Sequence, residues 1–202
     1  MKLLLIGPQA SGKGTQAKLL AEKLGVPHIS TGDLLRAQTG EIRKEIDSYI
    51  VSGNLYPNEK MLKILKERFE REDCNEGYIL DGFPRNLKQA EMLDEITKID
   101  KVIEIDISDE EAVRRLGGRV SCENCDEGYN LVTIPPKDPD KCDKCGGGLV
   151  IRDDDKEDAI RKRLGIYHGD TEPILARYGL VKINGEQSIE KVQEEIVESL
   201  GV

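Results

Sequence analysis

The stretch KLLLIGPQASGKGT, residues 2–15, joins a short apolar run to a glycine-rich turn. The run Lys2–Ile6 predicts a buried β-strand, and Lys13–Leu24 carries the apolar spacing of a helix that ends at Gly25. Between them stands the spacing G-x-x-x-x-G-K. Glycines at these places let backbone amides turn toward phosphate oxygens, and the helix directs its positive end at the same place. The stretch therefore predicts a phosphate-binding loop, the alternative being a tight turn with a surface lysine.

Four further apolar runs alternate with helical patterns along the chain. They are Pro27–Ile29, Tyr78–Leu80, Val102–Asp106 and Leu180–Ile183. Such alternation is typical of a parallel sheet covered by helices on both faces. A last helix is expected to start at Ser188 and to bury Ile189, Val192, Ile196 and Leu200. We predict an α/β fold around a five-stranded parallel sheet.

Two segments interrupt this alternation. Residues 30–56 hold two short helical patterns with no strand between them, and residues 118–155 concentrate Gly, Pro, Asp and Cys. Both are expected to be insertions into one core made of residues 1–29, 57–117 and 156–202. At roughly 100 to 200 residues per domain, a length of 202 residues fits a single core with small inserted lobes.

The second insertion carries all but one of the cysteines, in two Cys-x-x-Cys pairs. The expected metal ligands are Cys122, Cys125, Cys142 and Cys145. Two such pairs, separated by residues 126–141, form two knuckles that close a tetrahedral site. Four thiolates leave no open position, so a structural ion is expected: zinc, with iron as an alternative. The other alternative is four free thiols. Cys74 is expected to be an ordinary thiol near a helix end.

The composition disfavours some classes of partner. The chain has 39 acidic and 30 basic residues, a formal net charge of -9, which disfavours nucleic acid and anionic membrane surfaces. The apolar run Leu3–Ile6 is far too short for a signal peptide or a membrane span, which predicts a cytoplasmic protein. Residues 119–152 hold five basic and six acidic residues. This balance disfavours an ATPase that carries a nucleic-acid-binding zinc ribbon, the alternative from another class.

Several motifs extend the glycine-rich loop and together span essentially the whole chain. The loop continues as G-K-G-T-Q-A, and the later motifs are S-T-G-D-L-L-R (30–36), D-G-F-P-R (81–85), R-L-G-G-R (115–119) and R-D-D-D (152–155). This pattern resembles adenylate kinases. The resemblance implies a P-loop three-layer fold with an AMP-binding helical lobe and a metal-bound lid. It also implies reversible in-line transfer of the terminal phosphoryl group of ATP to AMP, giving two ADP, in nucleotide biosynthesis and homeostasis.

The resemblance implies that the glycine-rich loop and the lid hold ATP. The implied ATP-binding residues are Gln9, Ala10, Ser11, Gly12, Lys13, Gly14, Thr15, Arg119 and Gln187. Gly14 stands where the general motif has a Ser or Thr that holds Mg²⁺, and Thr15 is the nearest hydroxyl. Asp81, at the end of a predicted strand, is therefore expected to fix the Mg²⁺ that accompanies ATP, through water. Its alternative role is a helix cap before Gly82.

The implied AMP site combines the first insertion with the segment that follows the third strand. Its residues are Thr31, Arg36, Asn54, Leu55, Tyr56, Gly82, Phe83, Pro84, Arg85, Gln89, Arg152 and Arg163. An amide side chain offers a donor and an acceptor to an adenine edge, so Gln89 is expected to select the base. Thr31 is expected against the same base, with a helix N-cap as its alternative role.

Phosphoryl transfer needs positioning and charge neutralisation more than covalent participation of the protein. Arginine suits this task because its planar group binds phosphate oxygens in pairs and stays charged. The implied catalytic residues are Lys13, Asp81, Arg85, Arg119, Arg152 and Arg163. The phosphate of AMP is largely a dianion at neutral pH, so neither His28 nor His168 is needed as a base. For Arg163, a surface ion pair near Glu157 or Asp158 is the alternative.

The nearest alternative among enzymes is a kinase for another nucleoside monophosphate, such as UMP or CMP. Gln89 and Thr31 favour AMP, but a base preference is a difference between two affinities. The expected ligands are ATP, AMP and ADP, without nucleic acid or membrane, and the resemblance implies a monomer.

Overall fold

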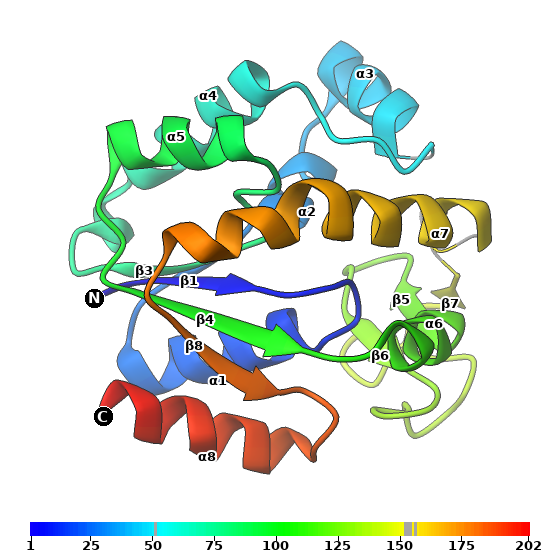
Figure 1. Cartoon of the computed structure of the whole chain (residues 1–202). Coiled ribbons are helices and arrows are strands. Elements are labelled where there is room, and N and C mark those ends of the chain that lie inside the picture. Colours follow the sequence, from blue (N-terminus) through cyan, green and yellow to red (C-terminus); the bar gives the residue numbers. More distant parts are fainter. Residues whose placement is uncertain (51, 152–154, 156) are drawn as a thin grey trace.

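The chain folds around a parallel sheet of five strands (Figure 1). The computed structural model describes residues 1–202 except 51, 152–154 and 156. The strands lie in the order β2-β3-β1-β4-β8. Their bounds are β1 (Lys2–Ile6), β2 (His28–Ser30), β3 (Tyr78–Asp81), β4 (Lys101–Asp106) and β8 (Leu180–Asn184). All five predicted strands are confirmed to within one residue at each end, and so is their parallel pairing.

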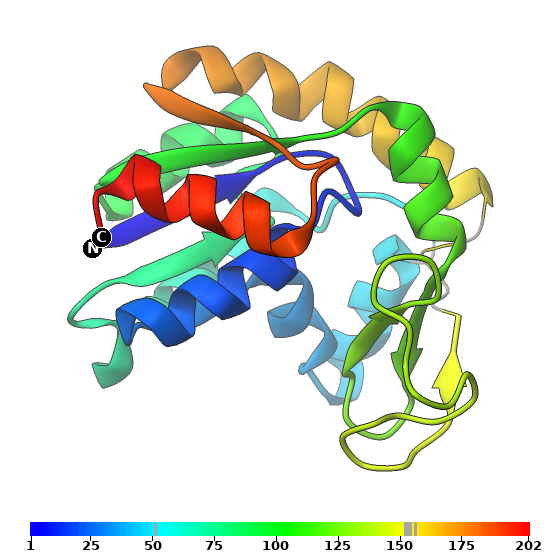
Figure 2. The ribbon, with the colours of Figure 1, turned by 90° about the horizontal axis from the view of Figure 1, so that it is seen from below.

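Helices cover both faces of this sheet. The α-helices of the described chain, which include those that cover the sheet, are α1 (Lys13–Leu24), α2 (Thr31–Arg36), α3 (Gly40–Ile50), α4 (Asn58–Phe69), α5 (Leu87–Ile96), α6 (Asp109–Gly117), α7 (Glu157–Ile166) and α8 (Ile189–Leu200). Shorter helical segments are η1 (Glu72–Cys74), η3 (Tyr167–Thr171) and η4 (Glu172–Arg177). Helices α1 and α8 lie on one face, and α5 and α7 lie on the other (Figures 1 and 2). The predicted three-layer α/β fold is confirmed.

The alternation of side chains along β1 explains the two cores. Leu3 and Leu5 point to one face, where they pack with buried residues of α1 and α8. Leu4 and Ile6 point to the other face and pack with buried residues of α4 and α5. Because both faces are buried, the strand is a continuous apolar run, as expected for a parallel sheet.

Local sequence sets the ends of the two helices on the first face. Gly25 ends α1 in the left-handed conformation (φ 66°), and the Ser188 hydroxyl accepts a hydrogen bond from the first turn of α8. Three of the four residues predicted to be buried on α8 are buried, but Ile189 is only half-buried. It opens the first turn, beside the larger cavity described below, and so has no core neighbour on that side.

The two predicted insertions have distinct structures. Helices α2 and α3 occupy the first one. The second contains an antiparallel sheet in the order β6-β5-β7, formed by β5 (Arg119–Cys122), β6 (Gly128–Asn130) and β7 (Leu149–Val150). Val120 and Pro136 are the only buried aliphatic side chains of residues 119–150, all of which the structure describes. This lobe therefore has almost no hydrophobic core of its own.

His168 joins the start of α6 to the segment that follows α7. Its Nδ1 lies 2.8 Å from Glu172 Oε2, and its Nε2 lies 2.9 Å from Asp109 Oδ1. Hydrogen bonds to Glu172 and Asp109 raise the pKa of His168 above its ordinary value. His168 thus links α6 to the segment that directly follows α7, with one carboxylate on each side of its ring.

We expect this link to make stability depend on pH. Since the folded-state pKa of His168 is raised, its contribution is complete below the unfolded-state value near 6.5 and is lost as the pH rises through the folded-state pKa. The side chain is 46% exposed, so the contribution is at most about 1 kcal/mol. Urea denaturation of the unaltered protein and of His168→Gln at pH 5.5 and pH 9 checks this. A difference in unfolding free energy that stays constant between these pH values contradicts it.

Among the described residues, no helix combines the length and the hydropathy that a membrane span requires.

Candidate functional site

The glycine-rich loop joins β1 to α1 at the carboxyl edge of the sheet. Gly7 has φ 152°, and a Cβ atom there would lie 2.1 Å from the Ile105 carbonyl oxygen, so only glycine fits. Gly12 precedes α1 in the left-handed conformation, and the unpaired amides of the first turn of α1 open toward the cavity that the loop lines. The predicted strand, turn and helix are all present.

Lys13 folds back over this loop and is not a surface residue. Its Nζ donates to the carbonyl oxygens of Gly7 at 2.8 Å and Pro8 at 2.6 Å. Burial lowers the pKa of Lys13 to about 8, Asp81 opposes this shift, and the positive charges of Arg85, Arg163 and Arg119 reinforce it. The ammonium group is therefore still charged at neutral pH and lies where several guanidinium groups converge.

A cavity of about 1000 Å³ extends from the loop toward the second insertion. Predicted residues that line it are Gln9, Ala10, Ser11, Gly12, Lys13, Gly14, Thr15, Arg36, Asp81, Gly82, Phe83, Pro84, Arg85, Arg119, Arg163 and Gln187. This volume is at the upper end of the range for small-molecule sites. All residues predicted to hold ATP thus face one space.

A second, smaller cavity lies between the first insertion and the segment after β3. Predicted residues that line it are Thr31, Arg36, Asn54, Leu55, Tyr56, Gly82, Phe83, Arg85, Gln89 and Arg163. Three arginines, Arg36, Arg85 and Arg163, line both cavities. The structure thus brings together every predicted nucleotide-site residue except Arg152, which lies outside the described residues.

Asp81 and Thr31 lie between the loop and the smaller cavity, and neither caps a helix. Ser30 is the N-cap of α2, while the Thr31 hydroxyl donates to the Asp81 carbonyl at 3.3 Å. The Asp81 carboxylate lies 3.7 Å from His28 Nε2. Burial would raise the pKa of Asp81, but His28 and Lys13 hold it below its ordinary value. An ionised carboxylate is therefore available at the carboxyl end of β3.

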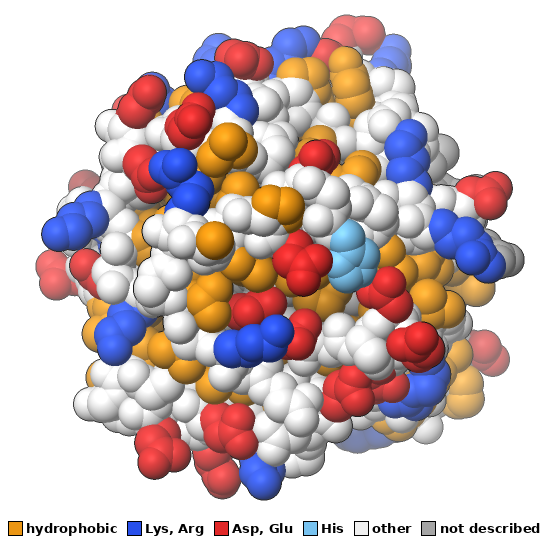
Figure 3. Space-filling view, viewed as in Figure 1, with side chains coloured by type: hydrophobic (Ala, Val, Ile, Leu, Met, Phe, Trp, Pro, Cys, Tyr) orange, Lys and Arg blue, Asp and Glu red, His pale blue; other side chains and the backbone are white. Residues whose placement is uncertain are grey.

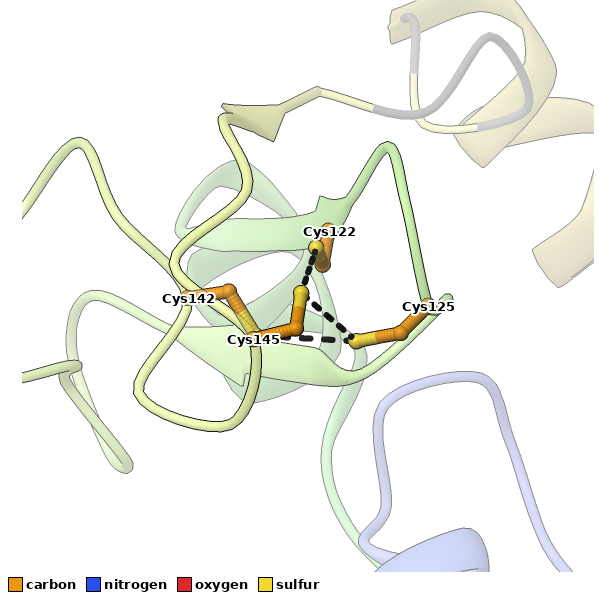
Figure 4. A group of neighbouring side chains, drawn as sticks. All are labelled: Cys122, Cys125, Cys142 and Cys145. Carbon is orange, nitrogen blue, oxygen red and sulfur yellow. Dashed lines mark hydrogen bonds between the residues drawn. The ribbon is translucent and has the colours of Figure 1, made fainter.

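The four cysteines of the second insertion converge, and their sulfur atoms all lie within 4.8 Å of one another (Figure 4). The two pairs have the same turn: Asp126 N donates to the Cys122 carbonyl at 3.0 Å, and Gly146 N donates to the Cys142 carbonyl at 2.8 Å. Asp126 and Gly146 both have positive φ. The two predicted knuckles are therefore confirmed.

The positions of the four sulfur atoms fit tetrahedral coordination of one metal ion. Three of the distances between sulfur atoms are 3.4 Å for Cys122 and Cys145, 3.6 Å for Cys125 and Cys142, and 3.4 Å for Cys125 and Cys145. Four thiolates at about 2.3 Å from a zinc ion would be about 3.8 Å apart. Tyr129 supports the group, since its hydroxyl accepts from Asp143 N and lies 3.4 Å from Cys142 Sγ. The cluster can hold a metal ion with little rearrangement.

Comparison with known proteins identifies the family. The family model described as adenylate kinase matches residues 5–182. Adenylate kinase of Archaeoglobus fulgidus is 47% identical over 208 aligned positions, which cover 97% of this chain and 96% of that protein. Adenylate kinase of Caldicellulosiruptor bescii is 41% identical over 214 positions, which cover both proteins completely.

The chain belongs to the adenylate kinase family. The predicted family is thereby confirmed, and with it the predicted enzyme class, a phosphotransferase that acts on ATP and AMP. Adenylate kinase of Methanocella arvoryzae, 46% identical over 97% of this chain and 96% of its own length, agrees with this membership.

Two residues of this adenylate kinase family member that contact predicted site residues escaped prediction from the sequence. The Asp155 carboxylate is fully buried and pairs with Arg119, whose Nε lies 2.6 Å from Oδ2, and with Arg163, whose Nη1 lies 3.3 Å from Oδ1. Arg163 thus pairs with a buried carboxylate. Asn58 contacts Gln89 from behind the smaller cavity. The sequence alone does not single out either residue, because Asp155 belongs to a run of acidic residues and Asn58 is the first residue of a helix.

Proposed function

We propose that ATP occupies the larger cavity, AMP occupies the smaller one, and phosphoryl transfer takes place where the cavities meet. The observation that carries this proposal is that Arg36, Arg85 and Arg163 line both spaces. Bringing two polyanions together requires fixed positive charge at the junction, and guanidinium groups supply it without losing a proton. An oxygen of the AMP phosphate attacks the terminal phosphorus of ATP, and the bond to the bridging oxygen breaks as ADP leaves.

The positive groups divide between the two substrates. Lys13 and the loop amides hold the phosphates of ATP, and Arg119 reaches them from the second insertion. Arg36 and Arg85 hold the AMP phosphate, while Arg163 and Arg152 contact the group in transfer. Lys13 exchanges the carbonyl oxygens of Gly7 and Pro8 for phosphate oxygens when nucleotide binds. Once the nucleotides are bound, these cations stabilise the transition state because they need no further reorganisation during the reaction.

The smaller cavity has the features of a site for a purine base. Tyr56 and Met61 supply apolar walls, being 6% and 4% exposed, and Gln89 supplies a polar amide that is 2% exposed. A buried amide without a matching ligand would lose hydrogen bonds, so it selects bases by their donor and acceptor pattern. The AMP site also includes Asn54, Leu55, Thr31 and the segment Gly82–Pro84.

Two metal ions are part of the proposal. The ionised carboxylate of Asp81 faces the larger cavity and would hold the hydrated Mg²⁺ that accompanies ATP, which neutralises phosphate charge. Zinc is the ion proposed for the four cysteines, since it favours tetrahedral thiolate sites, and its role there is structural.

We also propose that residues 118–155 act as a lid and residues 30–56 as the AMP-binding lobe, with the remainder as the core. Supporting contacts bridge the lid and the core: Glu127 Oε1 lies 2.9 Å from Lys18 Nζ of α1. A lid that closes over the nucleotides excludes water from the reaction. The enzyme is proposed to act as a monomer in the cytoplasm, where thiols stay reduced and can bind the metal.

A nucleic-acid role for the lid is not favoured by its charge. On the described part of the face in Figure 3, Lys and Arg side chains are interspersed with Asp and Glu and form no continuous basic area. In the lid itself Lys144 is paired with Glu127 at 3.3 Å. A nucleic-acid-binding surface gathers basic side chains on one face.

A coupled assay that detects ADP tests the proposed function. We expect rapid turnover with ATP and AMP in the presence of Mg²⁺, and at least about tenfold lower kcat/KM with GMP, CMP or UMP, by the usual penalty for an unmatched base edge. Slow turnover with AMP together with fast turnover of a pyrimidine monophosphate would instead support the UMP/CMP kinase alternative.

A further inference from the structure

The amide of Gln89 belongs to a small hydrogen-bond network whose orientation is set by the backbone. Arg85 N donates to Gln89 Oε1 at 2.8 Å, and Gln89 Nε2 donates to Asn58 Oδ1 at 2.9 Å. The Gln89 backbone N–H donates to Asn86 Oδ1 at 2.9 Å, and Asn86 Nδ2 donates to Asn58 Oδ1 at 3.2 Å. Asn58 therefore receives two amide donors on one oxygen.

Each oxygen and nitrogen in this network has only one consistent placement. A backbone N–H can only donate. The Arg85 N–H therefore requires an oxygen at the Gln89 Oε1 position, and the Gln89 N–H requires an oxygen at the Asn86 Oδ1 position. The NH₂ groups of both side chains must then face Asn58, and Asn58 must present its oxygen. A reversed Gln89 amide would set its oxygen against the Asn58 oxygen and its NH₂ group against the Arg85 N–H. Reversal would lose two hydrogen bonds and create two repulsive contacts.

The orientation of this amide decides which purine it matches. Each polar atom of the Gln89 side chain makes one hydrogen bond within the described part of the chain, so one acceptor position and one N–H remain for a ligand. Adenine presents an N6 donor beside an N1 acceptor. Guanine and hypoxanthine present an O6 acceptor beside an N1–H donor. A base seated in the same way therefore needs one amide orientation if it is adenine and the opposite one if it is a 6-oxopurine.

We infer that Asn58 is a positioning residue for base selection: it holds the Gln89 amide in the orientation that accepts adenine and rejects 6-oxopurines. Asn58 does not line the cavity, so it acts through Gln89. Asn58 is half-buried at the first position of α4, so its side chain is not part of the hydrophobic core. This inference rests on the proposed function, because it takes Gln89 to contact the base of AMP.

The test compares AMP with IMP, whose hypoxanthine base has a 6-oxo group and lacks the 2-amino group of guanine. In Asn58→Leu the acceptor is lost, and we expect the ratio of kcat/KM for AMP to that for IMP to fall about tenfold, the effect of one hydrogen bond. The change should appear as a higher KM for AMP, with kcat and the KM for ATP within about twofold of the unaltered enzyme. Asn58→Ala should give the same fall in the ratio if the leucine variant does not fold.

Asn58→Asp is the matched control, because a carboxylate oxygen still accepts from both amides. Its AMP to IMP ratio should stay within about threefold of the unaltered enzyme. An unchanged ratio in Asn58→Leu and Asn58→Ala would overturn the inference, as would an equal loss in Asn58→Asp. Absence of AMP turnover in the unaltered enzyme would overturn the proposed function, and the inference with it. Both failures are therefore distinguishable in one set of assays.

Discussion

The Lys13→Met enzyme is expected to have a kcat about a thousandfold below that of the unaltered protein, the size of effect found when one fixed group that stabilises transition-state charge is removed. Lys13 is the one lysine among the cations proposed to meet the phosphates, and it lies at the point where Arg85, Arg119 and Arg163 also act. Methionine keeps the aliphatic stem but cannot neutralise a phosphate oxygen. Steady-state kinetics with saturating ATP and AMP measures the loss.

The same substitution should not lower stability. Because burial lowers the pKa of Lys13 to about 8, the charged side chain opposes folding wherever it is protonated, and stability rises with pH between about 8 and 10.5. Lys13→Met should remove this rise and have a thermal midpoint at least as high as the unaltered protein without nucleotide. Lys23→Met, in the last turn of the same helix and exposed, is the matched control for both measurements. A kcat within tenfold of normal in Lys13→Met would contradict the role of this side chain.

Removal of the metal is expected to split thermal unfolding into two transitions, with the lid melting well below the core. The physical reason is that residues 119–150 bury only two aliphatic side chains, Val120 and Pro136, so no hydrophobic core replaces the ion. The binding free energy of a structural zinc ion is then folding free energy for this lobe. Calorimetry with and without a chelator, combined with elemental analysis, measures both the transitions and the identity of the metal.

Cys142→Ser should behave like the chelated protein, because it removes one of the four ligands. Cys74→Ser is the matched control: Cys74 is buried outside the cluster, with its Sγ 3.0 Å from Arg68 Nη1. It should keep the metal and the order of the transitions. A metal-free protein that unfolds in one step at the original temperature would show that the ion does not hold the lid.

Patterns that depend on neighbouring residues were predicted well. The strand that ends at Ile6, the glycine-rich turn and the helix that starts at Lys13 are local, because phosphate-loop spacing and helix periodicity are properties of consecutive residues. The knuckles of the metal cluster are local in the same sense, since each Cys-x-x-Cys turn closes on itself. Some strand ends differ from the prediction by one residue. The second strand was predicted to start at Pro27 and starts at His28, because a proline has no N–H to pair with the next strand.

The amino-acid sequence by itself determined the layered fold, the glycine-rich loop, the four-cysteine cluster and the family, because each of these depends on the spacing of residues along the chain. Only the tertiary structure decided how distant side chains pair: that Asp155 joins Arg119 to Arg163, and that Asn58 holds Gln89. These contacts connect residues 8 to 36 positions apart on different elements. Their geometry depends on how the elements pack, which no local pattern encodes.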